Sequence, residues 1–288
     1  MSSDEFHVLE TGTILDEIVR ERKHILKAEK VERPMSVIVD SIEGDEREQG
    51  IQIDFAERLQ MGTDRTSKEA KLRVIGEIKR ASPSKGVFND KLNAVSQAAR
   101  YDAAGCAAVS VLTEQKFFRG SAADLSDIYE HIGHDAGRPA LLRKDFLFDP
   151  YQVFESRYLG ADAILLIVSI LPVDLLRYLI EIARELGMEA LVEVHTAEEL
   201  EIAESVGARV IGINNRNLST FSEDLSTFES LSKLSSSQAV LVAESAISSR
   251  SDAERMYRSG AIAVLVGESL VRSGNVSDFA GSLMLLEK

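Results

Sequence analysis

Short apolar runs alternate with longer amphipathic segments beyond residue 71, and this alternation most constrains the fold. Between the runs, apolar residues recur three and four positions apart, which is the spacing of a helix with one buried face. The alternation therefore predicts strands separated by single helices. The runs rich in Val, Ile and Leu occupy residues 74–78, 107–112, 140–146, 163–169, 189–195, 210–215, 239–245 and 263–269.

Eight such strands predict an α/β protein with a closed, parallel (β/α)8 barrel over residues 71–288. The competing architecture is an open doubly wound sheet, which usually has about six strands and a Gly-x-Gly-x-x-Gly turn after the first. No such turn follows residues 74–78. A barrel is the better prediction, and 288 residues suit one such unit.

Residues 1–70 do not share this rhythm. Residues 13–30 have the pattern of an amphipathic helix, residues 39–50 read as an acidic surface loop, and residues 52–60 suit a further short helix. We expect this segment to be a helical extension that caps one end of the barrel rather than a separate domain.

The charge balance limits the partners of the protein. A net charge of −14 argues against nucleic acid and anionic membranes, because binding to either needs a basic face. An anionic ligand therefore requires a site that locally reverses the field of the whole protein. No apolar run approaches the roughly 20 residues of a membrane span, and the first residues do not resemble a secretory signal. We expect a cytoplasmic protein.

The single cysteine, Cys106, stands in the apolar stretch AAGCAAVSVL. This setting favours a small buried hydrophobic residue over a nucleophile, and a lone cysteine excludes an internal disulfide.

Polar residues stand at the predicted strand ends, where barrels of this kind carry their active sites. In VIGEIKRASPSKG, strand alternation puts Glu77 and Lys79 on one side of the sheet. The pair is either a solvated ion pair at an edge or a pair required for a ligand. The other strand ends favour the ligand, because independent strands would not ordinarily collect so many charged and polar groups: Ser82, Lys144, Glu193, Asn214, Arg216, Glu244 and Ser245.

The last two strand ends suggest a phosphate site. Backbone N–H groups after these strands usually form the phosphate cradle of this fold. Ser245, Ala246, Gly267 and Glu268 occupy those turns, and Lys79 or Arg216 can add charge-assisted hydrogen bonds. The alternative is a pair of ordinary turns with serine N-caps.

These motifs together resemble the indole-3-glycerol phosphate synthase family of tryptophan biosynthesis. The resemblance covers the barrel and, more weakly, the N-terminal helix, with one motif for each predicted strand. It rests on EIKRASPSKG, SVLTEQKFFRGS, LLRKDFLFDPYQ, ADAILLIVSIL, LVEVH, IGINNRNL, VAESAI and VLVGESL.

The resemblance implies roles for individual residues. Lys144 is the expected general acid and Glu193 the general base. Glu77 is expected to bind substrate hydroxyls and the anilino nitrogen, and Lys79 to contact the carboxylate or phosphate and to share proton transfer. Asn214 is expected to bind a hydroxyl. Serines contact the substrate, Arg216 lies near its phosphate, Glu244 is a further substrate contact, and His195 is given no role. The remaining expected contacts are Ser82, Ser245, Phe118, Phe146, Leu165 and Leu265.

The implied reaction closes a ring in a phosphorylated anilino-ribulose, with loss of CO2 and water, and needs neither a metal nor an organic cofactor. We expect no macromolecular partner beyond a weak homodimer at most. Lys79 and Lys144 are further expected to lower each other's pKa. Two positions depart from the family: many members have Gly in place of Ala246, and Ser or Thr in place of Glu268. The carboxylate of Glu268 must then turn away from the phosphate.

Three other functions remain open from the residues alone. A Schiff-base aldolase would use Lys79 or Lys144 as its nucleophile. An isomerase of the same pathway, which is also a phosphate-binding barrel, uses a Cys and an Asp as its acid and base. This sequence argues against it, because Cys106 precedes the second strand and Glu77 and Lys79 end the first. A non-catalytic barrel that binds a phosphorylated metabolite or a partner protein would not need both Lys144 and Glu193.

Overall fold

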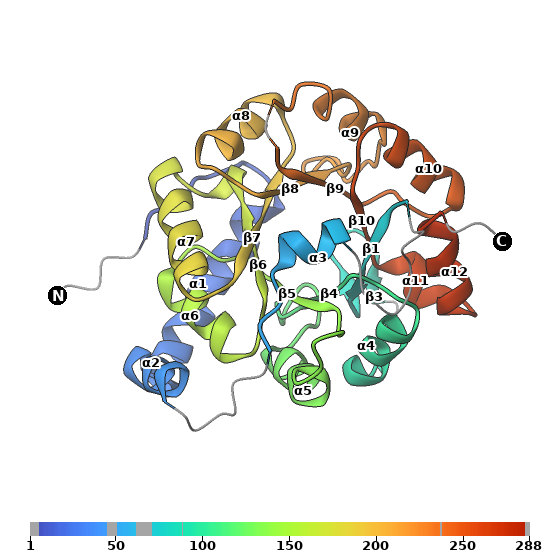
Figure 1. Ribbon diagram of the computed structural model, residues 1–288. Coiled ribbons are helices and arrows are strands. Elements are labelled where there is room, and N and C mark those ends of the chain that lie inside the picture. The colour runs from blue at the N-terminus through green and yellow to red at the C-terminus, as the bar shows by residue number, and fades with distance from the viewer. Residues whose placement is uncertain (1–5, 45–50, 62–70, 88, 237, 286–288) are drawn as a thin grey trace.

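The computed structural model describes residues 6–44, 51–61, 71–87, 89–236 and 238–285 (Figure 1). Eight parallel strands form a closed barrel, and β1 pairs with both β4 and β10, which closes it. The predicted barrel is confirmed, and the open sheet is wrong. The barrel strands are β1 (Arg73–Ile78), β4 (Ala108–Leu112), β5 (Ala140–Lys144), β6 (Ala163–Ile167), β7 (Glu189–Val194), β8 (Val210–Asn214), β9 (Val240–Glu244) and β10 (Ala263–Val266).

Helices follow the strands and surround the barrel (Figure 1). Most begin at a polar N-cap side chain that accepts a backbone hydrogen bond, as Asp149 does for α6 and Thr196 for α8. A short hairpin of β2 (Ala81–Ser82) and β3 (Gly86–Val87) follows β1. The outer helices are α4 (Ala94–Ala103), α5 (Ala122–Ile132), α6 (Pro150–Tyr158), η1 (Val168–Ile170), α7 (Val173–Glu185), α8 (Ala197–Ser205), α9 (Ser226–Leu231), α10 (Arg250–Arg258), α11 (Glu268–Arg272) and α12 (Val276–Leu283).

The N-terminal extension contacts both ends of the barrel. Helix α1 (Ile14–Glu32) lies at the carboxyl ends of the strands, where its Leu15 and Ile18 border the large cavity described below. Helix α3 (Phe55–Met61) crosses the opposite end (Figure 1), where Asp54 and Arg209 lie 3.3 Å apart. The expectation of a cap at one end was therefore too simple.

Two further expectations for the extension fare differently. Residues 39–43 belong to helix α2 (Met35–Glu43), so the first part of the predicted acidic loop is wrong, while residues 45–50 lie outside the described residues. The division at residue 70 stays a prediction, because residues 62–70 also lie outside the described residues.

Cys106 is fully buried, as expected. In the described part of the chain, no helix is both long enough and apolar enough to cross a membrane.

Candidate active site

A cavity of about 470 Å³ opens at the carboxyl ends of the strands. Every residue predicted for the site lines it, from all barrel strands except β4 and from the segments that follow the strands. The structure thus brings the predicted set together, although the roles of its members stay predictions. The set is Glu77, Lys79, Ser82, Phe118, Lys144, Phe146, Leu165, Glu193, Asn214, Arg216, Glu244, Ser245, Ala246, Leu265, Gly267 and Glu268.

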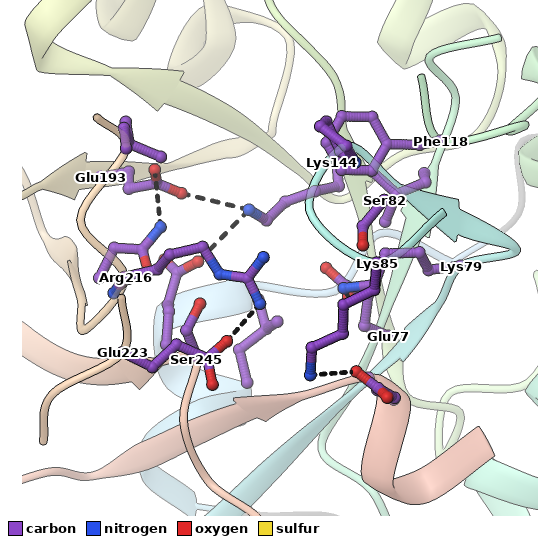
Figure 2. Close-up of a pocket in the computed structure, with 18 of the residues that line it drawn as sticks. Glu77, Lys79, Ser82, Lys85, Phe118, Lys144, Glu193, Arg216, Glu223 and Ser245 are labelled. Carbon is purple, nitrogen blue, oxygen red and sulfur yellow. Dashed lines mark hydrogen bonds and ion pairs between the residues drawn. The ribbon is translucent and has the colours of Figure 1, made fainter. Parts of the chain in front are cut away.

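Lys144 lies at the centre of the charged cluster at the bottom of this cavity. Its Nζ is 3.2 Å from Oε2 of Glu193 and 3.3 Å from Oε2 of Glu244 (Figure 2). All three side chains are buried or nearly so. Parallel strands bring them together, because β5, β7 and β9 each end at the same mouth of the barrel.

Burial disfavours the charged form of Lys144, but the carboxylates of Glu193, Glu244 and Glu77 outweigh it and raise its pKa. The expectation that Lys79 lowers the pKa of Lys144 is therefore wrong. The expectation fails because each lysine has acidic neighbours. Lys79 forms an ion pair with Glu77, and Lys144 lies between the carboxylates of Glu193 and Glu244. Lys144 is a firmly held ammonium group.

The two carboxylates beside Lys144 have opposite pKa shifts. Burial tends to raise the pKa of Glu193, but Lys144, His195 and Asn214 together hold it well below its usual range. Burial and the nearby charge of Glu193 raise the pKa of Glu244 to about 8, despite Lys144. The two carboxyl groups beside Lys144 thus have pKa values that their surroundings push apart. Such a pair suits combined acid and base chemistry.

Two glycines make room for these carboxylates. A Cβ on Gly267 would overlap Oε2 of Glu77, and one on Gly212 would overlap Oε1 of Glu244. From the sequence, Gly267 was expected to serve the phosphate alone, and Gly212 was missed. Glycine inside an otherwise apolar strand was the available signal, because it marks a close approach by another group.

Strained backbone follows β9. Ser245 and Ala246 both adopt left-handed conformations, with φ of +63° and +64°. This region costs glycine little and other residues more. A glycine at position 246 would adopt this conformation at less cost than Ala246 does.

Basic side chains at the mouth of the cavity are each paired with an acid. Arg216 forms an ion pair with Glu223 and donates to Oγ of Ser84 at 2.6 Å. Lys85 lies 2.7 Å from Glu268. A dashed line at the Lys85 ammonium marks this ion pair in Figure 2. The carboxylate of Glu268 thus has a cationic partner of its own. Lys85, Glu223 and Ser84 were missed from the sequence, because hairpin and loop residues come together only in the folded chain.

Residues 15–283 match the sequence model of the family described as indole-3-glycerol phosphate synthase. The chain belongs to this family. A protein of that name from Dehalococcoides mccartyi strain CBDB1 is 47% identical over 73% of this chain and 80% of its own length. Another, from Thermoanaerobacter pseudethanolicus, is 38% identical over 92% of this chain and 96% of its own.

The chain also matches part of a longer relative. The multifunctional tryptophan biosynthesis protein of Schizosaccharomyces pombe is 46% identical to this chain. The match covers 81% of this chain but only 30% of that protein's length. Among solved structures, 3-hexulose-6-phosphate synthase superposes with a TM-score of 0.57 at 11% identity, covering 74% of this chain and 99% of its own. At this identity the likeness shows the barrel fold alone.

An apolar wall completes the cavity of this indole-3-glycerol phosphate synthase family member. The rings of Phe118 and Phe146 lie 6.1 Å apart, and Leu165 and Leu265 also line the cavity. Helix α1 adds Leu15, which the sequence pattern places on a buried helix face without identifying what it covers. The wall suits a flat aromatic group beside a charged one.

Helix α1 is also joined to the strand end that carries Lys144. Asp145 accepts a hydrogen bond from Thr113 at 2.7 Å and lies 3.3 Å from Arg143. Arg22 of α1 approaches the same carboxylate at 3.4 Å. All these side chains are buried. This network fixes the backbone on which Lys144 stands, and no pattern in the sequence identified it.

Proposed function

We propose that the chain catalyses the reaction for which its family is named. It converts 1-(2-carboxyphenylamino)-1-deoxyribulose 5-phosphate to indole-3-glycerol phosphate, CO2 and water. The observation that carries the proposal is the position of Lys144 between Glu193 and Glu244, in one cavity with an aromatic wall and basic side chains.

Binding comes first. The substrate carries a carboxylate and a phosphate, and Lys79, Lys85 and Arg216 offer cations at the same cavity of an acidic protein. Each cation is already held by a neighbouring acid or hydroxyl, so the substrate anions compete with Glu77, Glu268 or Glu223. We assign the benzoate ring to the wall of Phe118 and Phe146, and the phosphate to the turns after β9 and β10.

Ring closure follows. The ring carbon that bears the carboxylate attacks C2 of the sugar chain, and Lys144 protonates the oxygen of that carbonyl. The C–CO2 bond then breaks, its electron pair restores the aromatic ring, and CO2 leaves. A fixed ammonium in a buried site stabilises the oxyanion as it forms, because little solvent screens the charge.

Dehydration completes the reaction. The hydroxyl formed from the carbonyl takes a second proton and leaves as water, while Glu193 removes a proton from the adjacent carbon. Two protons reach the departing oxygen and one returns from carbon, so each turnover consumes one proton from solvent. An ionised Glu193 suits the role of base, and Asn214, which donates to it at 3.2 Å, holds its orientation.

The test is direct. Purified protein is incubated with the anilino-ribulose phosphate and with no added metal, and the fluorescence of the indole product is followed. The proposal expects product with the wild type and at least about a hundredfold less with Lys144→Ala. No product from folded wild-type protein would overturn it.

A second measurement separates the synthase from a Schiff-base aldolase. Borohydride is added during turnover, and the mass of the protein is measured. An unchanged mass supports the synthase, whereas a substrate adduct on Lys79 or Lys144 would favour the aldolase. We further propose that the protein acts as a monomer or weak homodimer in the cytoplasm, without a nucleic-acid or membrane partner.

A further inference from the structure

His195 lies directly behind Glu193, on the side away from Lys144. Its ring Nε2 is 3.3 Å from Oε1 of Glu193, and its Nδ1 is 3.1 Å from Oε2 of Glu199. The Nε2 contact has the distance of an ion pair, without the alignment of a hydrogen bond. The imidazole therefore bridges a carboxylate of the reaction cavity and a carboxylate of helix α8.

Glu199 is itself fixed in place. Thr196 caps the start of α8, and Glu199 N–H donates to Oγ1 of Thr196 at 3.2 Å. The Glu199 carboxylate accepts from the backbone N–H of His195 at 2.7 Å and from the same residue's ring. A histidine held at both ring nitrogens by carboxylates has little freedom to rotate, and both contacts favour its doubly protonated form.

A second cavity, of about 450 Å³, reaches His195 from the other side. His195 and Glu199 line it, together with Arg216 and Asp224, whereas Glu193 and Lys144 line only the first cavity. Among the described residues, Glu193 and Glu199 are the charged groups in contact with the imidazole, and Arg216 and Asp224 share its cavity. Burial lowers the pKa of His195, but Glu193 and Glu199 outweigh it and raise that pKa to about 10.

We propose that His195 is a positioning residue: a permanently protonated imidazolium, anchored by Glu199, that holds Glu193 ionised and aimed at the reacting carbon. Glu193 then lies between two cations, Lys144 in front and His195 behind. Its charge persists even while Lys144 gives up a proton to the substrate. The proposal rests on the proposed function only for the task of Glu193, because the charge state of His195 can be measured without substrate.

The charge state is tested by NMR of the imidazole nitrogens and of the ring C2–H of the full chain. His195→Gln identifies the signal of this residue by its loss. In the wild type we expect both ring nitrogens to carry protons, and the C2–H shift to stay constant from about pH 5.5 to 8.5, although an ordinary histidine titrates near 6.5. In Glu199→Gln, which removes this negative charge and keeps an amide oxygen as hydrogen-bond acceptor, the pKa of His195 should fall. A wild-type His195 that titrates near 6.5 would overturn the proposal.

The kinetic test uses the same variant. His195→Gln removes the charge, so the acid limb of kcat should move upward by about one pH unit. On that limb kcat should be lower by up to about tenfold, while near pH 8 it should change little and KM should stay within about twofold. The control is His131→Gln, the same substitution at an exposed histidine. A merely structural role would lower the melting temperature and leave the acid limb in place, and that result would overturn the proposal. An inactive wild type with a protonated His195 would instead refute only the proposed function.

Discussion

The charge balance around Lys144 makes a quantitative prediction for Lys144→Met. Among the described residues, Lys144 is the only cation within ion-pair distance of Glu244, whereas Glu193 also has His195. Methionine fills a similar volume without charge. The variant therefore leaves the Glu244 carboxylate buried and unpaired.

Breaking a buried pair by removal of one partner costs about 3–5 kcal/mol. Glu244 can escape part of this cost by taking up a proton, because its pKa is already raised to about 8 and rises further without Lys144. A raised carboxyl pKa means that the folded state binds a proton which the unfolded state releases above about pH 4.3. Stability of the variant must then fall as pH rises. The wild type follows the same slope up to about pH 8, so the slopes of the two proteins separate only above that pH. We expect the variant to lose about 3 kcal/mol relative to the wild type at about pH 8.5 and about 2 kcal/mol at about pH 6.

The measurement is urea unfolding followed by circular dichroism at both pH values. Lys91→Met, at an exposed lysine, is the matched control and should change stability little. The double variant Lys144→Met/Glu244→Gln should recover most of the loss at the higher pH, because the unpaired charge is gone. If Lys144→Met is as stable as the control at about pH 8.5, the buried pairing of Lys144 with Glu244 is wrong.

The remaining predictions concern activity. Glu193→Gln should lower kcat at least about a hundredfold with little change in KM, because it removes the base and keeps the size of the side chain. A comparable rise in KM would contradict this. Gly267→Ala should lower kcat, because the added Cβ displaces the Glu77 carboxylate. Gly274→Ala is the control and should leave kcat unchanged, because no atom lies within 4 Å of the added Cβ. Arg216→Ala should mainly raise KM, and an unchanged KM would exclude it from phosphate binding.

Much of the fold and of the site could be predicted from the sequence, because both depend on local pattern plus one rule of topology. Buried parallel strands are continuous apolar runs, and their carboxyl ends must meet. That rule alone places Lys144, Glu193 and Glu244 at one mouth of the barrel.

Most of what escaped prediction depends on contacts between distant segments. The sequence did not show that Glu244 shares Lys144 with Glu193, and this sharing reverses the expected pKa shift of Lys144. The approach of Arg22 to Asp145 joins α1 to β5 across more than a hundred residues. One missed contact is local: Glu199 lies four residues after His195, and nothing in the sequence showed that its carboxylate contacts the imidazole.

A crystal structure with bound indole-3-glycerol phosphate tests the central claim most directly. The account predicts the indole ring against Phe118 and Phe146, its five-membered ring within reach of both Lys144 and Glu193, and the phosphate at the turns of Ala246 and Gly267. A product bound elsewhere, or in reach of only one of the two catalytic groups, would contradict it.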